Sequence, residues 1–352
     1  MPTSCQPYLP PEWAPQYGVM LTWPHGHGDW GNNLQGIDRN FVDMARHIAR
    51  FEQVIISAFD EAHAEHIDHL LKQAGVDPGQ YTIYVVASND IWVRDHGPLT
   101  VLCSGEAKLL DFGFNGWGGK YRHDLDNVLS RTLSRQQAFA GTPMETVDWI
   151  LEGGSVEVDG SGTLLSTTSC LLNPNRNPQL NREQLEAVLK THLGLNRVLW
   201  LEHGHLEGDD TDGHIDTLAR FCDRTTIAYV RCDDPRDSHY ESFRLMEAEL
   251  QQMRSAEGQP YKLVALPWPK PVLNEEGGRL PANYANFLII NGAVLVPLYN
   301  DPADTHALAA MASCFPDREI IGIDSLALIN QYGGIHCASM QLPAEVSGPG
   351  KR

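Results

Sequence analysis

The sequence predicts an α/β protein made of five copies of one structural unit that close into a ring. Strand and turn signals followed by helical periodicity recur in the fixed order strand, strand, helix, strand. Each unit spans about 50 to 70 residues and leaves an apolar face that a neighbouring unit must cover. The 352 residues, 42% of them hydrophobic, suffice for one large core. An ordinary α/β protein whose elements alternate by chance remains the alternative.

The first two units differ in regularity. The first, roughly 13–90, offers only one clear strand, Gly18–Trp23, before its helix, and Gln53–Ser57 follows. Its helix is indicated by apolar residues at helical spacing, namely Ile37, Phe41, Met44 and Ile48. The second unit, 91–151, shows the complete order. Its elements are expected at Leu99–Leu102, Lys108–Asp111, Leu125–Leu133 and Thr146–Leu151.

The third unit, 152–205, shows the order most clearly. A strand at 155–158 turns at the polar, glycine-containing segment 159–162 and returns through Thr163–Thr167. The following helix, from about Arg182 to Leu193, carries an apolar stripe, and Arg197–Leu201 is typical of a third strand.

The fourth unit, 211–267, and the fifth, 283–341, repeat this order. The fourth is expected to contain strands near Thr217–Phe221 and Thr226–Val230, a helix with Phe243, Met246, Leu250 and Met253 on one face, and the strand Lys262–Leu266. The fifth is expected to contain Phe287–Ile290, an Asn-Gly hairpin turn, Ala293–Val296, a helix carrying Leu308, Met311 and Phe315, and Glu319–Ile323. We therefore expect a single catalytic domain, 1–352, with 342–352 as a flexible tail.

Composition limits the classes of partner. A formal net charge of −19 disfavours nucleic acid and anionic membranes, which require clustered Lys and Arg, and favours a cationic substrate. Seven scattered cysteines without a C-x-x-C pair argue against a disulfide framework or a zinc ribbon. The N-terminus lacks a basic start and an apolar run, and no stretch is long and apolar enough to span a membrane. We expect a soluble, cytoplasmic protein.

Polar motifs occupy corresponding places in the units. They are WVRDHGP (92–98), EGGS (152–155), TDGHID (211–216) and GGIHC (333–337). If the units surround an axis, their equivalent ends converge there and bring together Asp95, Glu152, His214, Asp216 and Cys337. Singly, each has a simpler interpretation: a surface ion pair at Arg94-Asp95, a tight turn, a polar strand face, or a packed thiol. Their joint pattern favours one shared pocket.

The same motifs, with FNGWGGKY (114–121), NRNPQL (175–180) and NYANFLIING (283–292), resemble the agmatine deiminase and bacterial peptidyl-arginine deiminase-like family. The resemblance covers nearly the whole chain and implies the pentein fold, a five-bladed pseudo-symmetric αβ propeller with its active site at the central axis. It implies a hydrolase of polyamine biosynthesis that converts agmatine and water to N-carbamoylputrescine and ammonia, without a metal or other cofactor.

The resemblance also implies a role for each site residue. Cys337 is the nucleophile, His214 the general acid/base, and Asp95 and Asp216 hold the guanidinium group, with Glu152 beside the histidine. Further substrate-binding positions are Trp92, Trp117 and Gly334. Two segments depart from the family pattern: Ala338-Ser339-Met340-Gln341 after the cysteine, and the short stretch Trp268–Leu280. Both affect the identity of the substrate more than the deimination chemistry.

These residue types suit deimination for physical reasons. Carboxylates match the planar fork of N–H donors on a guanidinium group, so they can hold its carbon in front of a thiolate. The thiolate adds, the histidine protonates departing ammonia, and water activated by the same histidine hydrolyses the covalent thiouronium intermediate. Carboxylates should also raise the pKa of the thiol, so we expect the bound cation to restore the thiolate.

Several alternatives stay open. A metal-dependent hydrolase is suggested by the cluster His203, His205, Glu207, Asp209 and Asp210. An amidinotransferase and a non-catalytic guanidino-compound binder also fit the motifs. Among substrates, an acidic pocket favours agmatine over arginine or peptidyl arginine, although the sequence does not show where Arg94, Arg122 and Arg176 point. The resemblance also makes a homo-oligomer an expectation.

Overall fold

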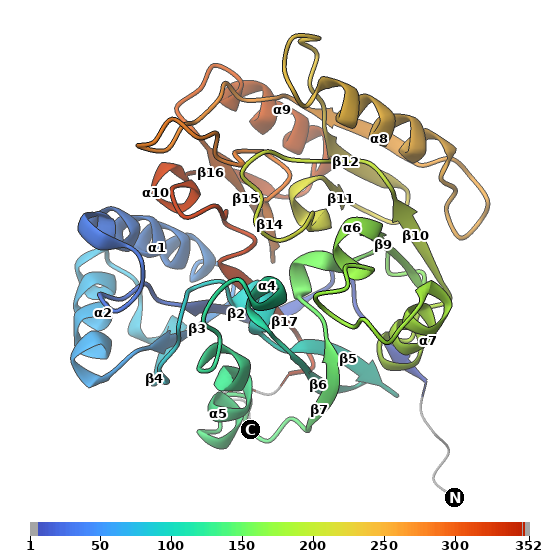
Figure 1. Cartoon of the computed structure of the whole chain (residues 1–352). Helices are drawn as coiled ribbons and strands as arrows, with labels where there is room; N and C mark the ends of the chain where they lie inside the picture. The colour runs from blue at the N-terminus through green and yellow to red at the C-terminus, as the bar shows by residue number, and fades with distance from the viewer. Residues whose placement is uncertain (1–5, 347, 349–352) are drawn as a thin grey trace, which may run out of the picture.

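The computed structural model of the chain describes residues 6–346 and 348. It is a mixed α/β structure with five separate sheets of three or four strands each. In Figure 1 the longer helices lie at the periphery of the molecule, and the sheets lie between these helices and the centre. The predicted α/β class is therefore confirmed.

The fourth predicted unit illustrates how each sheet is built. β11 (Ala219–Phe221) and β12 (Thr226–Val230) form an antiparallel hairpin. The chain then passes through α8 (Tyr240–Gln252) and returns as β13 (Lys262–Leu266), parallel to β12. The buried face of α8 consists of Phe243, Met246 and Leu250, which are three of the four residues expected there. The apolar spacing in the sequence predicted this helix correctly because the helix buries one apolar face.

Three other sheets have the same connectivity. One sheet is formed by β5 (Leu99–Cys103), β6 (Glu106–Gly113) and β7 (Met144–Ile150), and α5 (Leu129–Arg135) connects β6 to β7. The strand β1 (Pro7–Tyr8) pairs with β5 at the edge of this sheet. The next contains β8 (Glu157–Val158), β9 (Thr163–Thr167), α7 (Arg182–Leu193) and β10 (Arg197–Leu201). Another contains β14 (Leu288–Ile290), β15 (Ala293–Leu298), α9 (Asp304–Cys314) and β16 (Glu319–Asp324).

The remaining sheet explains the incomplete first unit. Here β2 (Gln16–Thr22) and β3 (Gln53–Ala58) are parallel and flank α1 (Leu34–Ile48) in sequence, while α2 (Glu61–Gln73) leads to β4 (Tyr81–Val85). The antiparallel partner of β2 is β17 (Ser339–Pro343), from the other end of the chain. The strand missing from the first unit thus follows the fifth.

This pairing changes the predicted C-terminal boundary. We expected a tail from residue 342, but Leu342 and Pro343 belong to β17, and Val346 is buried. Strand pairing with β2 and apolar burial hold these residues. Within the predicted tail, residues 347 and 349–352 lie outside the described residues, as does Cys5.

Shorter elements connect the sheets. The short helices are α3 (Val93–His96), α4 (Gly116–Gly119), α6 (Thr168–Leu171) and α10 (Leu326–Ile329). The 3-10 helices are η1 (Gly31–Asn33), η2 (Pro78–Gln80), η3 (Asp126–Val128), η4 (Gly153–Ser155) and η5 (Ile215–Thr217). No helix among residues 6–346 is long and apolar enough to cross a membrane.

Most described cysteines are buried in the apolar interior. Cys170, Cys222, Cys232, Cys314 and Cys337 are free thiols, whereas Cys103 is disulfide-bonded. Cys337 packs within an apolar cluster that also contains Leu21, Trp92 and Trp117. Burial of the thiol in the core and its possible role as a nucleophile are therefore compatible.

Candidate active site

Five short segments bring the site residues together, and each lies just ahead of a strand that pairs antiparallel with its neighbour. Asp95 precedes β5, Glu152 precedes β8, and Asp216 precedes β11. Asn286 precedes β14, and Cys337 precedes β17. All five residues are buried. Equivalent positions in the five sheets thus supply one polar side chain each.

The Cys337 thiol contacts two of these residues. Its Sγ accepts a hydrogen bond from Asn286 Nδ2 at 3.1 Å and lies 3.6 Å from Asp216 Oδ2. The other end of the amide, Asn286 Oδ1, accepts the backbone N–H groups of His336 and Cys337 at 3.0 and 3.3 Å. A side chain at Gly334 would collide with this amide. Asn286 therefore fixes both the thiol and the loop that carries it.

Asp95 is held by donors on each of its carboxylate oxygens. Trp117 Nε1 donates to Oδ2 at 2.9 Å, and the backbone N–H of Gly154 donates to Oδ1 at 2.9 Å. Trp117 adopts a left-handed backbone conformation with φ of 54°, which is costly for a bulky residue. We interpret this strain as a consequence of directing the indole N–H at the carboxylate.

Gly154 leaves space at the centre of the site. A Cβ added there would lie 2.5 Å from His214 Nδ1, 2.8 Å from Asp95 Oδ1 and 3.2 Å from Asp216 Oδ2. The two carboxylates and the imidazole therefore border one small region that only glycine leaves open.

The imidazole of His214 lies between two carboxylates. Nδ1 is 3.6 Å from Asp95 Oδ1, and Nε2 is 3.7 Å from Glu152 Oε2. Neither ring nitrogen has a hydrogen-bond partner, although the side chain is fully buried. Burial opposes the charged form, but the charge of Asp95, with contributions from Cys170 and Glu152, raises the pKa of His214 well above its usual range. The geometry thus favours an imidazolium ready to donate a proton.

Glu152 is neutralised from its other side by an arginine. Arg176 Nε lies 3.0 Å from Glu152 Oε1 and 3.3 Å from Oε2, with both side chains buried. Arg176 also forms an ion pair with Asp212 and donates to the carbonyl of Thr211 at 2.9 Å. A buried charge needs this kind of pairing, so Arg176 is committed to the protein and is not free for a ligand.

Asp216 belongs to a second buried network. His336 Nδ1 lies 2.7 Å from Asp216 Oδ2, and His336 Nε2 lies 2.7 Å from Glu12 Oε2. Glu12 in turn pairs with Arg220 at 2.7 Å. Burial alone would raise the pKa of Asp216, but His336 outweighs it and lowers that pKa. The second oxygen of Asp216, Oδ1, has no hydrogen-bond partner and is available to a cationic ligand.

The pKa values of Asp95 and of the Cys337 thiol are raised, whereas that of Asp216 is lowered. Burial, with the nearby charges of Asp216 and Glu152, raises the pKa of Asp95 to about 6 against the opposing charge of His214. Burial, Asp216 and Asp95 together raise the pKa of the Cys337 thiol well above its usual range. The free site therefore carries uncompensated negative charge next to a protonated thiol. A planar cation that lies between the carboxylates relieves both conditions.

The two tryptophans predicted to bind substrate, Trp92 and Trp117, have different surroundings in the structure. Trp117 contacts Asp95 directly through its indole nitrogen. Trp92 instead packs beside Gly333, where any side chain would collide with its ring, and lies 6.2 Å from the ring of Trp30. Trp92 thus shapes the loop that carries the thiol.

Sequence reasoning missed several residues around the thiol and histidine. Asn286 and His336 lie within motifs that we recognised, but neither was given a role. Cys170 Sγ lies 4.0 Å from Glu152 Oε2 and was counted only among the scattered cysteines. Repeat equivalence could have identified Asn286, because it precedes the first strand of its hairpin as Asp95, Glu152 and Asp216 do.

The predicted metal-ligand segment does not converge. His203 Nδ1 pairs with Glu249 at 2.6 Å, and Asp210 accepts a hydrogen bond from Tyr121 at 2.8 Å. The backbone N–H of Glu207 donates to His239 at 2.8 Å. Among the residues that the structure describes, the three acid, thiol and imidazole side chains whose ligand atoms all lie within 4.8 Å of one another are Glu152, Cys170 and His214.

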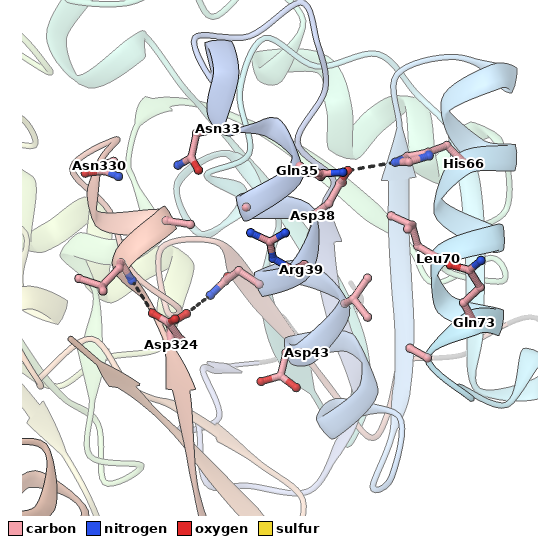
Figure 2. A pocket seen from close by; sticks show the side chains of 16 residues that line it. Asn33, Gln35, Asp38, Arg39, Asp43, His66, Leu70, Gln73, Asp324 and Asn330 are labelled. Carbon is pink, nitrogen blue, oxygen red and sulfur yellow. Dashed lines mark hydrogen bonds and ion pairs between the residues drawn. The ribbon is translucent and has the colours of Figure 1, made fainter. Parts of the chain in front are cut away.

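A separate open cavity of about 930 Å³ lies away from these residues, between α1, α2 and α10 (Figure 2). Asp38 and His66 form an ion pair on its wall at 3.0 Å, as Figure 2 shows. None of the predicted site residues lines this cavity. The volume of a cavity alone therefore does not identify the catalytic residues.

Together the fold and the site define a mixed α/β enzyme with a buried cysteine, histidine and carboxylate constellation. The chain belongs to the Porphyromonas-type peptidyl-arginine deiminase family, whose model matches residues 8–343. This membership confirms the resemblance that the motifs suggested.

Similar proteins agree with this assignment. An agmatine deiminase of Stutzerimonas stutzeri is 35% identical, with 96% of this chain and 95% of the relative covered. A proposed arginine deiminase of Porphyromonas gingivalis is 46% identical with a TM-score of 0.89, over 96% of this chain and 99% of the other. The agmatine deiminase of C. jejuni with substrate bound is 36% identical with a TM-score of 0.89, over 97% of each chain.

Proposed function

We propose that this chain is an agmatine deiminase that hydrolyses agmatine to N-carbamoylputrescine and ammonia. The observation that carries the proposal is a buried thiol beside Asp216, with Asp95 and His214 bordering the same small region. Two curated relatives that are 35% identical over 96% of this chain are agmatine deiminases. The site is built for a cationic, planar group because its carboxylates exceed its free cations.

The first step is substrate binding. The guanidinium group donates to Asp95 and to Asp216 Oδ1, which has no partner in the free protein. Its positive charge lowers the pKa of Cys337, so the thiol releases its proton to solvent as the complex forms, and the imidazolium of His214 keeps its own proton for the next step. Asn286 Nδ2 already points at Sγ and stabilises the thiolate that forms.

The chemical steps then follow from the position of His214. The Cys337 thiolate adds to the guanidinium carbon to give a tetrahedral adduct. His214 donates a proton to one amino group, ammonia leaves, and a thiouronium intermediate remains on sulfur. His214, now neutral, accepts a proton from water as the water attacks the same carbon, and collapse of that adduct releases the ureido product and the thiol.

The arginines support agmatine as the substrate. Agmatine lacks the α-carboxylate of arginine, for which an enzyme would supply a free cation. Arg94 donates to Gln341 at 2.6 Å and to the carbonyl of His336 at 3.2 Å. Arg176 is paired with Glu152, and Arg122 forms a surface pair with Asp124. Arg94 Nη2 has no hydrogen-bond partner, but it lies 3.9 Å from Glu12 Oε2. Each of the three arginines whose directions the sequence left open therefore has a carboxylate of the protein as a partner.

A substrate panel tests the proposal. Agmatine, arginine, an N-acyl arginine amide and an arginine-containing peptide are compared by release of ammonia and formation of ureido product. We expect agmatine to have the highest kcat/KM and the Cys337→Ser variant to show no turnover. A higher kcat/KM for arginine or for the peptide refutes agmatine and supports the second candidate, which the similarity to the proposed arginine deiminase of Porphyromonas gingivalis favours.

The acceptor separates hydrolysis from transfer. An amidinotransferase of the same chemistry would pass the amidino group to an added amine and would release little ammonia with water alone. We expect ammonia release to be independent of added amines, since no second substrate is needed to resolve the thiouronium with water.

We also propose that the five sheets form the blades of a pseudo-symmetric propeller whose axis passes through the site. The shared connectivity of the sheets and the equivalent positions of the five polar residues support this arrangement. The cytoplasmic location and a homo-oligomeric state remain predictions, which cell fractionation and light scattering of the purified chain test.

A further inference from the structure

Beyond the nucleophile, the site contains a second thiol, Cys170, which has no role in the proposed mechanism. Cys170 Sγ, Glu152 Oε2 and a ring nitrogen of His214 lie within 4.8 Å of one another, and all three side chains are buried. We infer that these three residues form a binding site for Zn²⁺, and that occupancy of this site inhibits the enzyme by capturing His214. The inhibitory effect, but not the binding site, rests on the proposed function.

The spacing of the three groups suits one small cation. Zn²⁺ bonds to thiolate at about 2.3 Å, to imidazole nitrogen at about 2.0–2.1 Å and to carboxylate at about 2.0–2.2 Å, so tetrahedral ligand atoms lie about 3.3–3.6 Å apart. In the free protein Glu152 Oε2 is 3.7 Å from His214 Nε2 and 4.0 Å from Cys170 Sγ. A contraction of a few tenths of an ångström therefore brings these two distances to bonding geometry, and the third, between Cys170 Sγ and a ring nitrogen of His214, is within 4.8 Å.

When Zn²⁺ displaces a proton from the His214 imidazolium, the ring offers a suitable lone pair. Nε2 of His214, the nitrogen that faces Glu152, has no hydrogen-bond partner although the side chain is fully buried. Buried polar atoms are normally satisfied, so an unpaired nitrogen directed at a carboxylate and a thiol requires an explanation. The mixed thiolate, imidazole and carboxylate set favours Zn²⁺ over Mg²⁺, which prefers oxygen ligands.

The charges of the three ligands balance a divalent ion. With Cys170 deprotonated and His214 neutral, Cys170 and Glu152 together carry a charge of −2, which one Zn²⁺ cancels. Asp212 is compensated separately, because it pairs with both Arg176 and Lys120.

Arg176 leaves one carboxylate oxygen accessible to the ion. It is closer to Glu152 Oε1, at 3.0 Å, than to Oε2, at 3.3 Å. Oε2 is also the oxygen that faces His214 and Cys170. Glu152 can therefore keep its ion pair through Oε1 and bind the metal through Oε2.

A polar cavity beside the cluster provides a route for the ion. It has a volume of about 440 Å³ and is lined in part by Ser169 and Gly213, the chain neighbours of Cys170 and His214. Asp209, Asp212 and Glu202 also line it and attract cations. The acidic segment that the sequence suggested as a metal centre thus lies on the approach to the ligands proposed here.

Direct metal binding tests the inference without depending on turnover. Zn²⁺ is titrated calorimetrically into the Cys337→Ser protein, in which the nucleophile cannot compete, and the complex is studied by zinc X-ray absorption. We expect one ion per chain with one sulfur ligand at about 2.3 Å, and no binding of Mg²⁺. Adding Cys170→Ser should weaken Zn²⁺ binding more than about tenfold, whereas the control Cys232→Ser, at another buried free thiol, should leave it unchanged.

Two results overturn the inference. One is Zn²⁺ binding that is unaffected by Cys170→Ser, and the other is an absorption spectrum without a sulfur ligand. The spectrum needs no change at Cys170, so the inference stays testable if Cys170→Ser fails to fold. In the wild-type enzyme we expect inhibition by Zn²⁺ that a chelator reverses and that Cys170→Ser weakens. An enzyme that turns over agmatine but does not bind Zn²⁺ refutes only this inference. A protein that binds Zn²⁺ but does not turn over agmatine refutes only the proposed function.

Discussion

The charge of Asp216 should control the ionisation of Cys337, and the substitution Asp216→Asn tests this directly. Asp216 Oδ2 lies 3.6 Å from Sγ in a fully buried setting. Removing the charge should make the free thiol easier to ionise, while it removes a partner of the substrate cation. The reactivity of the thiol and the rate of turnover are therefore expected to change in opposite directions.

The size of both changes can be estimated from this geometry. Two unit charges 3.6 Å apart interact by about 4.6 kcal/mol at an effective dielectric constant of about 20, which corresponds to about three pH units. His336, 2.7 Å from the same oxygen, already offsets part of that charge. We therefore expect the pKa of the thiol to fall by roughly one to three units. Loss of a buried charged contact costs about 2–5 kcal/mol, so kcat/KM for agmatine should fall about 30- to 5000-fold.

The assay follows alkylation of the Cys337 peptide by iodoacetamide as a function of pH, with mass spectrometry to separate it from the other thiols. The pH midpoint is measured in the wild type, in Asp216→Asn and in the control Asp148→Asn, which removes an exposed carboxylate. The wild type is also measured with a non-reacting guanidinium ligand, which should lower the midpoint. Equal midpoints in the wild type and Asp216→Asn refute the electrostatic reasoning, and a midpoint unaffected by the ligand refutes activation by substrate.

Three further predictions follow from the site. Gly154→Ala should reduce kcat/KM more than about 100-fold, because a side chain there collides with the imidazole and both carboxylates, whereas Gly26→Ala, with only one atom within 4 Å, should have no effect; full activity of Gly154→Ala contradicts the site. His336→Gln should shift the pH profile of kcat/KM without abolishing binding, because it removes the imidazole that lowers the pKa of Asp216, the carboxylate beside the thiol. Asp95, with a pKa of about 6, favours folding at low pH and loses that contribution as pH rises through 6. Agmatine needs the charged carboxylate, so it should raise the Tm of Cys337→Ser more at pH 8 than at pH 5, and an equal rise at both pH values contradicts this role.

The sequence predicted much of the fold because each helix and strand buries a regular apolar pattern. The helix Arg182–Leu193 and the strand Lys262–Leu266 match the predicted bounds end to end. The strand that completes the first sheet could not be placed, since β17 pairs with β2 across almost the full length of the chain. Local periodicity identifies strands but does not identify distant partners.

The site was predictable where a polar motif stands ahead of a predicted hairpin. Asp95, Glu152, His214, Asp216 and Cys337 do converge. Hydrogen-bond direction was not readable from sequence, because it depends on side-chain placement in three dimensions.

Cys170 shows the limit of motif reasoning most clearly. Nothing in the sequence distinguishes it from Cys222 or Cys232, which are also buried free thiols. Only folding places Cys170 beside Glu152 and His214.

The two thiols therefore differ in what makes them reactive. Cys337 lies among carboxylates that keep it protonated until a planar cation arrives, so its nucleophilicity is tied to the charge of the correct substrate. Cys170 lies beside a carboxylate that Arg176 partly neutralises, and beside an imidazole without a hydrogen-bond partner. A spherical divalent cation with a preference for sulfur meets three ligands there, whereas a guanidinium group is accommodated between Asp95 and Asp216. The same excess of negative charge thus selects two cations by shape, one as the substrate and one as an inhibitor.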